Sequence, residues 1–180
     1  MIFGDSSIFA IECEITERIE DWTYAHFRLW ADGDSIGDYD DEMDLQGGVY
    51  HLEKFLKYSD SRSEPGTDDK TKEEVFQIVF DSVMLTFPKE ASSFDVPIPD
   101  ESLVQYPNMI PRFHLDQSGM SSFSDKWNVI LIERRDEAAR LIWRELTDDL
   151  KDMEIREAIL SPGYFEDVTI KFIEWAKASF

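Results

Sequence analysis

The stretch Trp22–Gly33, with the sequence WTYAHFRLWADG, decides the fold because it joins an aromatic strand pattern to a turn. Its aromatic side chains favour extended backbone on a pleated surface. Asp32 and Gly33, at its end, tolerate the positive φ angles that a tight two-residue hairpin turn requires. We therefore predict a strand that turns back at Asp32–Gly33 into a short third strand at about residues 35–39.

The preceding stretch, Ile8–Ile15 (IFAIECEI), alternates in a way that is typical of a strand with one buried face. Cys13 falls on the apolar face and is predicted to be a small core residue. As the only cysteine, it excludes an internal disulfide and a cysteine-based zinc site. The predicted buried face carries Phe9, Ile11, Cys13 and Ile15, and the opposite face carries Ala10, Glu12 and Glu14.

An acidic stretch follows, Trp30–Asp44 (WADGDSIGDYDDEMD), which has seven carboxylates and no basic residue. Four interpretations are a metal-binding loop, a catalytic acid cluster, a docking surface for a basic partner, and a solvated turn. A calcium loop that begins at Asp32 would place Ile36 and Met43 where oxygen ligands are needed, so calcium binding is not expected. Carboxylates clustered on a turn are solvated, which gives no pair of separated pKa values for acid–base catalysis.

Docking is the interpretation that the acidic stretch favours over a solvated turn. Its carboxylates create a negative field that reaches about 8 Å at physiological salt, and a cationic surface would relieve their mutual repulsion. Aromatic residues beside charges are the usual composition of a tight interface, with an anchor inside a polar rim. The predicted contact residues are Trp30, Asp32, Asp34, Asp38, Tyr39, Asp40, Asp41 and Glu42.

The remaining chain is predicted to alternate between helices and strands, apart from two irregular segments. Asp44 is a candidate N-cap for a helix over 45–58, and TKEE from Thr71 forms a capping box for a helix over 72–85. The polar segment 59–72 is predicted to be a mobile surface loop, and 86–126, with five prolines, to be irregular. The other predicted elements are a central strand covered on both faces at 127–133, a helix at 136–147, a strand at 153–160 and a closing helix from about 165.

Arginines gather around the predicted helix at 136–147. Arg140 and Arg144, four residues apart, would share one face of that helix. Such a cluster suits either an anion site or surface pairing with neighbouring acids. The arginines concerned are Arg134, Arg135, Arg140 and Arg144.

The 180 residues are predicted to form a single α+β domain over 1–180, with an N-terminal antiparallel β-meander and a mixed sheet packed by about four helices. A net charge of −21 repels phosphate backbones and anionic lipids, so direct binding of nucleic acid or membrane is not expected. The charge suits a basic protein partner, or it serves solubility alone. No signal-peptide pattern and no apolar run of membrane-spanning length is present, which indicates a cytoplasmic protein.

Motifs for catalysis and cofactor binding are missing from the sequence. It has no HExxH, P-loop or GxGxxG pattern, so neither an enzyme nor a cofactor is expected. His51 and Glu53 form an H-x-E pattern, but the deaminase signature also needs cysteines that this chain lacks. Acid–base catalysis by two carboxylates that are distant in sequence and brought together by folding stays an open alternative.

The N-terminal third resembles a known family in the order of its motifs. MIFGD opens the chain, FAIE follows at Phe9–Glu12, and the aromatic strand runs into WADGDSIGDYD at Trp30–Asp40. LQGGVYHLEKFL then reads as an amphipathic helix, and WNVILIERRDEAARLIWR and SPGYFEDV match more loosely. This order resembles the immunity protein 42 family of bacterial polymorphic-toxin and contact-dependent inhibition systems.

The resemblance implies a non-enzymatic protein that binds a cognate toxin domain, often a nuclease, and blocks it in the producing cell. A nuclease presents lysine and arginine to phosphate, so an acidic inhibitor suits such a partner. Because immunity proteins vary most where they touch their toxin, segments 59–72 and 86–125 are rival interfaces to the acidic stretch.

Two readings from other classes remain at this point. An acidic DNA-mimic regulator of a host nucleic-acid-binding protein would bind many basic proteins with a steep salt dependence. An enzyme would need a concave pocket with converging polar groups.

Overall fold

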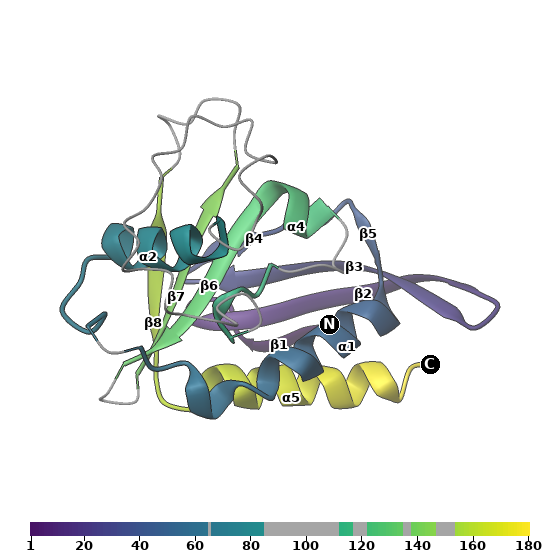
Figure 1. The fold of residues 1–180 in the computed structure, drawn as a ribbon. Helices are drawn as coiled ribbons and strands as arrows, with labels where there is room; N and C mark the ends of the chain where they lie inside the picture. The colour runs from purple at the N-terminus through teal and green to yellow at the C-terminus, as the bar shows by residue number, and fades with distance from the viewer. Residues whose placement is uncertain (65, 85–111, 117–121, 135–137, 147–153) are drawn as a thin grey trace.

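The computed structural model describes residues 1–64, 66–84, 112–116, 122–134, 138–146 and 154–180 (Figure 1). These residues form two antiparallel sheets and several helices, and the predicted α+β class is confirmed. A five-stranded sheet is built from the N-terminal part of the chain and a three-stranded sheet from the C-terminal part. The strands therefore pair within two separate antiparallel sheets and not within one mixed sheet.

The five-stranded sheet confirms the predicted N-terminal meander. The turn that follows β3 is formed by Asp32 (φ 52°) and Gly33 (φ 83°), as the dipeptide predicts. Strand β4 covers only part of the predicted 35–39, because Gly37 has a φ of 109° and a Cβ there would lie 2.9 Å from the Phe123 ring. The order is β1-β2-β3-β4 with β5 also paired to β3, and the strands are β1 Ile2–Asp5, β2 Phe9–Ile19, β3 Trp22–Ala31, β4 Asp34–Ile36 and β5 Glu42–Asp44.

One face of this sheet is covered by two helices, α1 (Leu45–Leu56) and α5 (Tyr164–Lys177), which lie side by side beneath it in Figure 1. The side chains that the alternation assigned to the core, with the exception of half-buried Ile15, are fully buried there. Burial of this much aromatic and aliphatic surface supplies the main stabilisation of the fold. The aromatic part of this core includes Phe9, Phe27, Phe55, Phe165 and Phe172.

Helix α1 begins as predicted, because the Asp44 carboxylate accepts hydrogen bonds from the N–H groups of Gln46 (3.0 Å) and Gly47 (3.1 Å). Glycine in the first turn of a helix lowers its helix propensity, but at position 48 the packing leaves no room for a larger side chain. A Cβ at Gly48 would lie 1.9 Å from the terminal methyl of Met43, which is buried against the helix. The helix ends at Leu56, two residues before the predicted end.

The three-stranded sheet contains β6 (Trp127–Glu133), β7 (Ala139–Glu145) and β8 (Arg156–Leu160), in that order. Strand β6 matches the predicted range and is buried on both faces, but β7 is the central strand of the sheet. The predicted helix at 136–147 is wrong, because residues 139–145 form β7. Both faces of β7 are buried, so its apolar residues form a continuous block that shows no strand period. The strand predicted at 153–160 is confirmed over the shorter range of β8.

Helix α2 (Lys72–Met84) covers the second face of this sheet. The predicted capping box is present: the Thr71 N–H donates to Glu74 at 2.9 Å, and the Glu74 N–H donates to the Thr71 hydroxyl at 3.3 Å. A short helix, α4 (Ser122–Lys126), leads directly into β6. A separate apolar cluster lies between α2 and the sheet, and it contains Val75, Phe76, Val79, Phe113, Ile130, Ile132 and Ile142.

The segment 59–72 packs into the protein at several points and is not wholly a surface loop. A 3₁₀ turn, η1 (Ser59–Ser61), opens it, and the side chains of Arg62, Glu64 and Thr67 are buried. The polar composition of this segment gave no sign of burial, because Arg62 is buried through its ion pairs with Glu133 and Glu166 and through packing on the Phe55 ring. Most of the predicted irregular segment 86–126 lies outside the described residues.

Candidate protein-binding site

The structure aligns the predicted acidic residues along one edge of the five-stranded sheet, which we call the acidic edge: Asp32, Asp34, Asp38, Asp40, Asp41 and Glu42. Both β4 and β5 pair with β3, with Asp34 opposite Ala31 and Glu42 opposite His26. Asp32 lies in the turn between β3 and β4, and the loop between β4 and β5 carries Asp38, Asp40 and Asp41. These carboxylates therefore lie along β3 and not on a single turn as the sequence predicted, because both short strands share that partner.

Cations from the C-terminal half of the chain neutralise part of the acidic edge. Lys126 Nζ lies 2.9 Å from Asp38 Oδ2 and 3.2 Å from Asp41 Oδ2, and Arg156 donates to Asp34 at 2.9 Å. The hydrogen bond from Lys126 lowers the pKa of the Asp38 carboxyl, and the bonds to Asp38 and Asp41 raise the pKa of Lys126. Sequence reasoning missed these pairs because Lys126 and Arg156 lie 88 and 122 residues away from Asp38 and Asp34.

The other acids of the edge face solvent. Asp32, Asp40 and Glu42 are exposed, and no cation of the described residues lies within ion-pair distance of their side chains. Their carboxylates are therefore accessible to a partner. The acidic edge therefore contains some carboxylates that form ion pairs within the protein (Asp34, Asp38 and Asp41) and others that are exposed to solvent (Asp32, Asp40 and Glu42).

The two predicted aromatic anchors, Trp30 and Tyr39, are already engaged with the sheet. The Arg28 guanidinium lies 4.5 Å from the centre of the Trp30 ring and 4.4 Å from that of Tyr39. Arg28 Nε donates to Glu12 at 2.7 Å, the Trp30 indole donates to the same oxygen at 2.8 Å, and the Tyr39 hydroxyl donates to Glu14 at 3.3 Å. Both rings are half-buried, so only part of each is open to a partner.

Glu12 holds this aromatic cluster together. Burial raises the pKa of the Glu12 carboxyl, but the hydrogen bonds from Arg28 and Trp30 outweigh burial and lower it overall. In contrast, burial and the nearby Glu12 and Glu14 charges raise the pKa of the Tyr39 hydroxyl. The pairing of Glu12 with Arg28 follows from the β2–β3 register, which the alternation of the two strands alone did not give.

A groove of about 540 Å³ lies beside the acidic edge, between the β4–β5 loop and the start of β6. Tyr39 and Trp127 supply aromatic surface to it, and Asp40 and Glu145 supply carboxylates. Arg28 and Lys126 line it as well, so its walls carry both signs of charge. The lining includes Arg28, Tyr39, Asp40, Lys126, Trp127 and Glu145.

The arginines assigned to the predicted helix at 136–147 are not surface pairs on a helix. Arg140 lies on β7, is 5% exposed, and donates to Glu157 and to the backbone oxygens of Thr67 (3.3 Å) and Lys70 (3.0 Å). Arg144, also on β7, stacks on Phe76 and Phe80 at 4.6 and 4.9 Å. Arg140 holds segment 67–70 against the sheet, and Arg144 packs against α2, so both arginines contribute to the packing of the fold.

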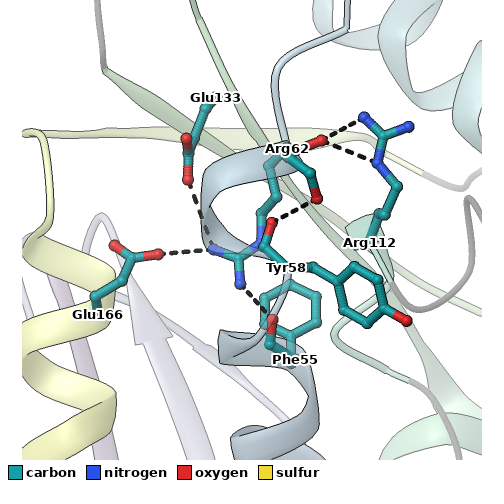
Figure 2. A network of polar contacts seen from close by, with 7 residues as sticks. Phe55, Tyr58, Arg62, Arg112, Glu133 and Glu166 are labelled. Atoms are coloured by element: carbon teal, nitrogen blue, oxygen red, sulfur yellow. Dashed lines mark hydrogen bonds and ion pairs between the residues drawn. The ribbon is translucent and has the colours of Figure 1, made fainter.

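A second buried arginine, Arg62, joins several elements (Figure 2). It is fully buried, donates to Glu166 at 2.7 Å and to the Phe55 carbonyl at 2.7 Å, and lies 3.6 Å from Glu133. Burial lowers the pKa of the Arg62 guanidinium, and the carboxylates of Glu166 and Glu133 oppose that effect. Arg112 reaches the Ser61 carbonyl from the other side. This network fixes α1, β6 and α5 to one another, so its role is structural.

The histidines lie apart from the acidic edge, except His26. His26 packs against Tyr39 with ring centres 5.4 Å apart, whereas His51 Nε2 donates at 3.1 Å to the Leu115 carbonyl inside the protein. Burial lowers the pKa of His51. His114 contacts Asp116 at 3.2 Å, and both are buried. Within the described ranges, no three His, Cys, Asp or Glu residues converge as metal ligands would.

Comparisons with known proteins place this fold. In the described part of the chain, no helix is both long and apolar enough to cross a lipid bilayer. The structure is similar to the crystal structure of CdiI from Burkholderia dolosa AUO158, with a TM-score of 0.66 and 14% identity over 97% of this chain and 99% of that one. A search of curated proteins returned no match. The model of the immunity protein 42 family matches residues 1–175. Because that match spans nearly the whole sequence, the chain belongs to the immunity protein 42 family.

Proposed function

We propose that this immunity protein neutralises a cognate bacterial toxin domain by binding it stoichiometrically in the cytoplasm of the producing cell, without catalysis. The observation that carries the proposal is the family match over residues 1–175. The toxin surface that it covers is basic, because the charge of −21 would repel an acidic surface and would speed the approach of a basic one.

The acidic edge supports this proposal through its prearranged charges. Lys126 and Arg156 already offset the repulsion among Asp34, Asp38 and Asp41, so those carboxylates are held in place before a partner arrives. The free carboxylates of Asp32, Asp40 and Glu42 can then pair with cations of the toxin. Prearranged partners lose less conformational freedom on binding, which favours tight association.

The groove beside the edge gives the toxin a defined point of entry. A lysine or arginine that enters it would meet the Asp40 and Glu145 carboxylates and the aromatic surfaces of Tyr39 and Trp127. Lasting protection requires slow release, hence a Kd of about 1 nM or below, which corresponds to about 12 kcal/mol. Buried anchors of this kind supply most of such affinity.

Growth rescue tests the proposal. The probe is the C-terminal domain of the protein encoded immediately upstream, expressed in cells with or without this chain. We expect full rescue by the wild-type chain and loss of rescue by the double variant Asp40→Lys/Glu42→Lys, which alters exposed residues only. The control Glu73→Lys/Glu174→Lys makes the same change of net charge at exposed sites on α2 and α5, outside both rival segments, and should rescue as well as wild type. Failure of the wild-type chain to rescue would overturn the proposal.

A further inference from the structure

The outer face of the β2–β3 hairpin lies next to the acidic edge but is not part of it. Helices α1 and α5 cover the opposite face of the sheet, and no described helix covers the outer one. Alternate residues of β3 lie on it, and in the view of Figure 1 the hairpin extends past the ends of both helices. We define the outer strip as Trp22, Tyr24 and His26 of β3 together with Ile19 of β2, which lies opposite Trp22.

The tip of the hairpin exposes two large apolar side chains. Ile19 and Trp22 lie directly opposite each other in the register, and they are 49% and 52% exposed. A solvated hairpin end needs no such pair, and exposed tryptophan beside exposed isoleucine is unfavourable in water. The turn between them also carries a strained residue, because Glu20 has a φ of 54° although it is not glycine. Both features are easier to explain on a contact surface.

The charges around the tip select the kind of partner. Glu17, Glu20 and Asp21 are exposed there, with Arg18 as the cation among them. The excess of carboxylates favours a basic protein surface, whose lysine or arginine side chains can also lie over the Trp22 ring. A second copy of this chain, a nucleic acid or an anionic membrane would place negative charge against negative charge.

The outer strip is continuous with the acidic edge. Along β3, Trp22 is followed on the same face by Tyr24 and His26, and His26 packs against Tyr39 with ring centres 5.4 Å apart. Tyr39 lines the groove together with Asp40. A single basic surface can therefore cover the groove and the hairpin tip at once, and standard interfaces have room for both.

We infer that the basic toxin domain docks on the outer strip as well as on the acidic edge, with Trp22 as its apolar anchor. This inference rests on the proposed function, and it identifies Trp22 as the principal residue of this protein that contacts the toxin. Trp22 takes the role that sequence reasoning gave to Trp30 and Tyr39, because Arg28 already contacts both rings and their polar atoms already donate to Glu12 and Glu14. Tryptophan is also among the residues that most often dominate binding energy.

Calorimetric titration tests the inference, with the purified C-terminal domain of the upstream-encoded protein as the probe. We expect Trp22→Ala to weaken binding by about 30-fold or more, because the anchor is lost. Ile19→Lys, at the same tip, should weaken binding through repulsion from the basic surface. The matched control is Tyr50→Ala on α1, an aromatic residue that is 68% exposed and lies on the helix side of the sheet; its affinity should stay within about twofold of wild type.

The outcomes separate the inference from the proposed function. If Trp22→Ala and Ile19→Lys both bind with wild-type affinity while Asp40→Lys/Glu42→Lys binds more weakly, the outer strip is not part of the interface. The acidic edge would then remain the binding surface. No binding of the wild-type chain would overturn both. A concentration-dependent dimer that Trp22→Ala abolishes in size-exclusion chromatography would assign the strip to a second copy and contradict the inference. Unchanged thermal unfolding of the tip variants would show that they alter contacts and not the fold.

Discussion

At the scale of single residues, the sheet depends on charges that satisfy one another inside partly buried clusters. Glu12 is the clearest case, because one carboxylate oxygen accepts from both Arg28 and Trp30 while its side chain is only 15% exposed. Hydrogen bonds to a charged group stabilise a fold more than neutral ones do. Because the Glu12 carboxylate must be charged to make these bonds, the free energy of unfolding should depend on pH.

Replacing Glu12 by glutamine should lower the free energy of unfolding by about 1–3 kcal/mol at pH 7, because two charge-assisted bonds are lost. The pKa of Glu12 is lowered in the folded protein, so its contribution is complete above the ordinary Glu pKa of about 4.3 and disappears as the pH falls through the folded-state pKa. Urea unfolding at pH 7, 5 and 3.5 measures the difference between the two proteins. A difference that does not shrink at the lowest pH would contradict this role of the Glu12 charge.

Arg62 should be the more costly residue to change. Arg62→Met leaves Glu166 and Glu133, 22% and 28% exposed, without their buried cation, and we expect a loss of about 3 kcal/mol or more in denaturant unfolding. The double variant Arg62→Met/Glu166→Gln should recover part of that loss, because one uncompensated charge is removed. A cost below about 1 kcal/mol for the single variant would show that the network in Figure 2 contributes little.

At the scale of elements, the same acidic stretch serves two purposes. Asp44 caps α1 through the N–H groups of Gln46 and Gly47, whereas Glu42, two residues earlier, is exposed and available to a partner. Asp44→Ala should therefore destabilise the protein by about 1 kcal/mol, and Glu42→Ala by less than about 0.5 kcal/mol. Thermal unfolding of the two variants checks this, and equal melting temperatures would contradict the division.

Local chemistry predicted several elements because their signals lie within a few residues. The Asp32–Gly33 turn, the Asp44 cap and the Thr71–Glu74 capping box could be read directly from the sequence. Strand β7 could not, because burial of both faces removes the alternation that marks a strand. Strand β5 is three residues long and is held by its pairing with β3, which no local pattern indicates.

In the candidate site too, features that depend on neighbouring residues could be predicted from the sequence, and features that depend on distant residues could not. The clustering of the carboxylates follows from their closeness in sequence, but Lys126 and Arg156 reach them from positions 88 and 122 residues away. The engagement of Trp30 depends on the register that sets Glu12 opposite Arg28. The exposure of Trp22 follows from its place on the outer face of the hairpin, which no described helix covers and which only the fold determines.

At the scale of the whole molecule, the net charge of −21 controls how the partner arrives more than how tightly it is held. Raising the salt from about 0.05 M to 0.5 M should slow association with the toxin domain by about tenfold or more, while dissociation changes little. Stopped-flow or surface-based kinetics at both concentrations measures the two rates. A salt effect confined to dissociation would contradict long-range steering, and loss of all specific binding at high salt would favour a DNA-mimic role.

The central claim is that this protein acts by occupying a basic toxin and not by turnover. Its most direct test is a titration of a fixed amount of the upstream-encoded toxin domain with increasing amounts of the purified chain, followed by the toxin's residual activity. We predict a linear loss of activity that ends at one chain per toxin domain. Complete inactivation by far less than an equal amount of the chain, or no inactivation at any ratio, would contradict the claim.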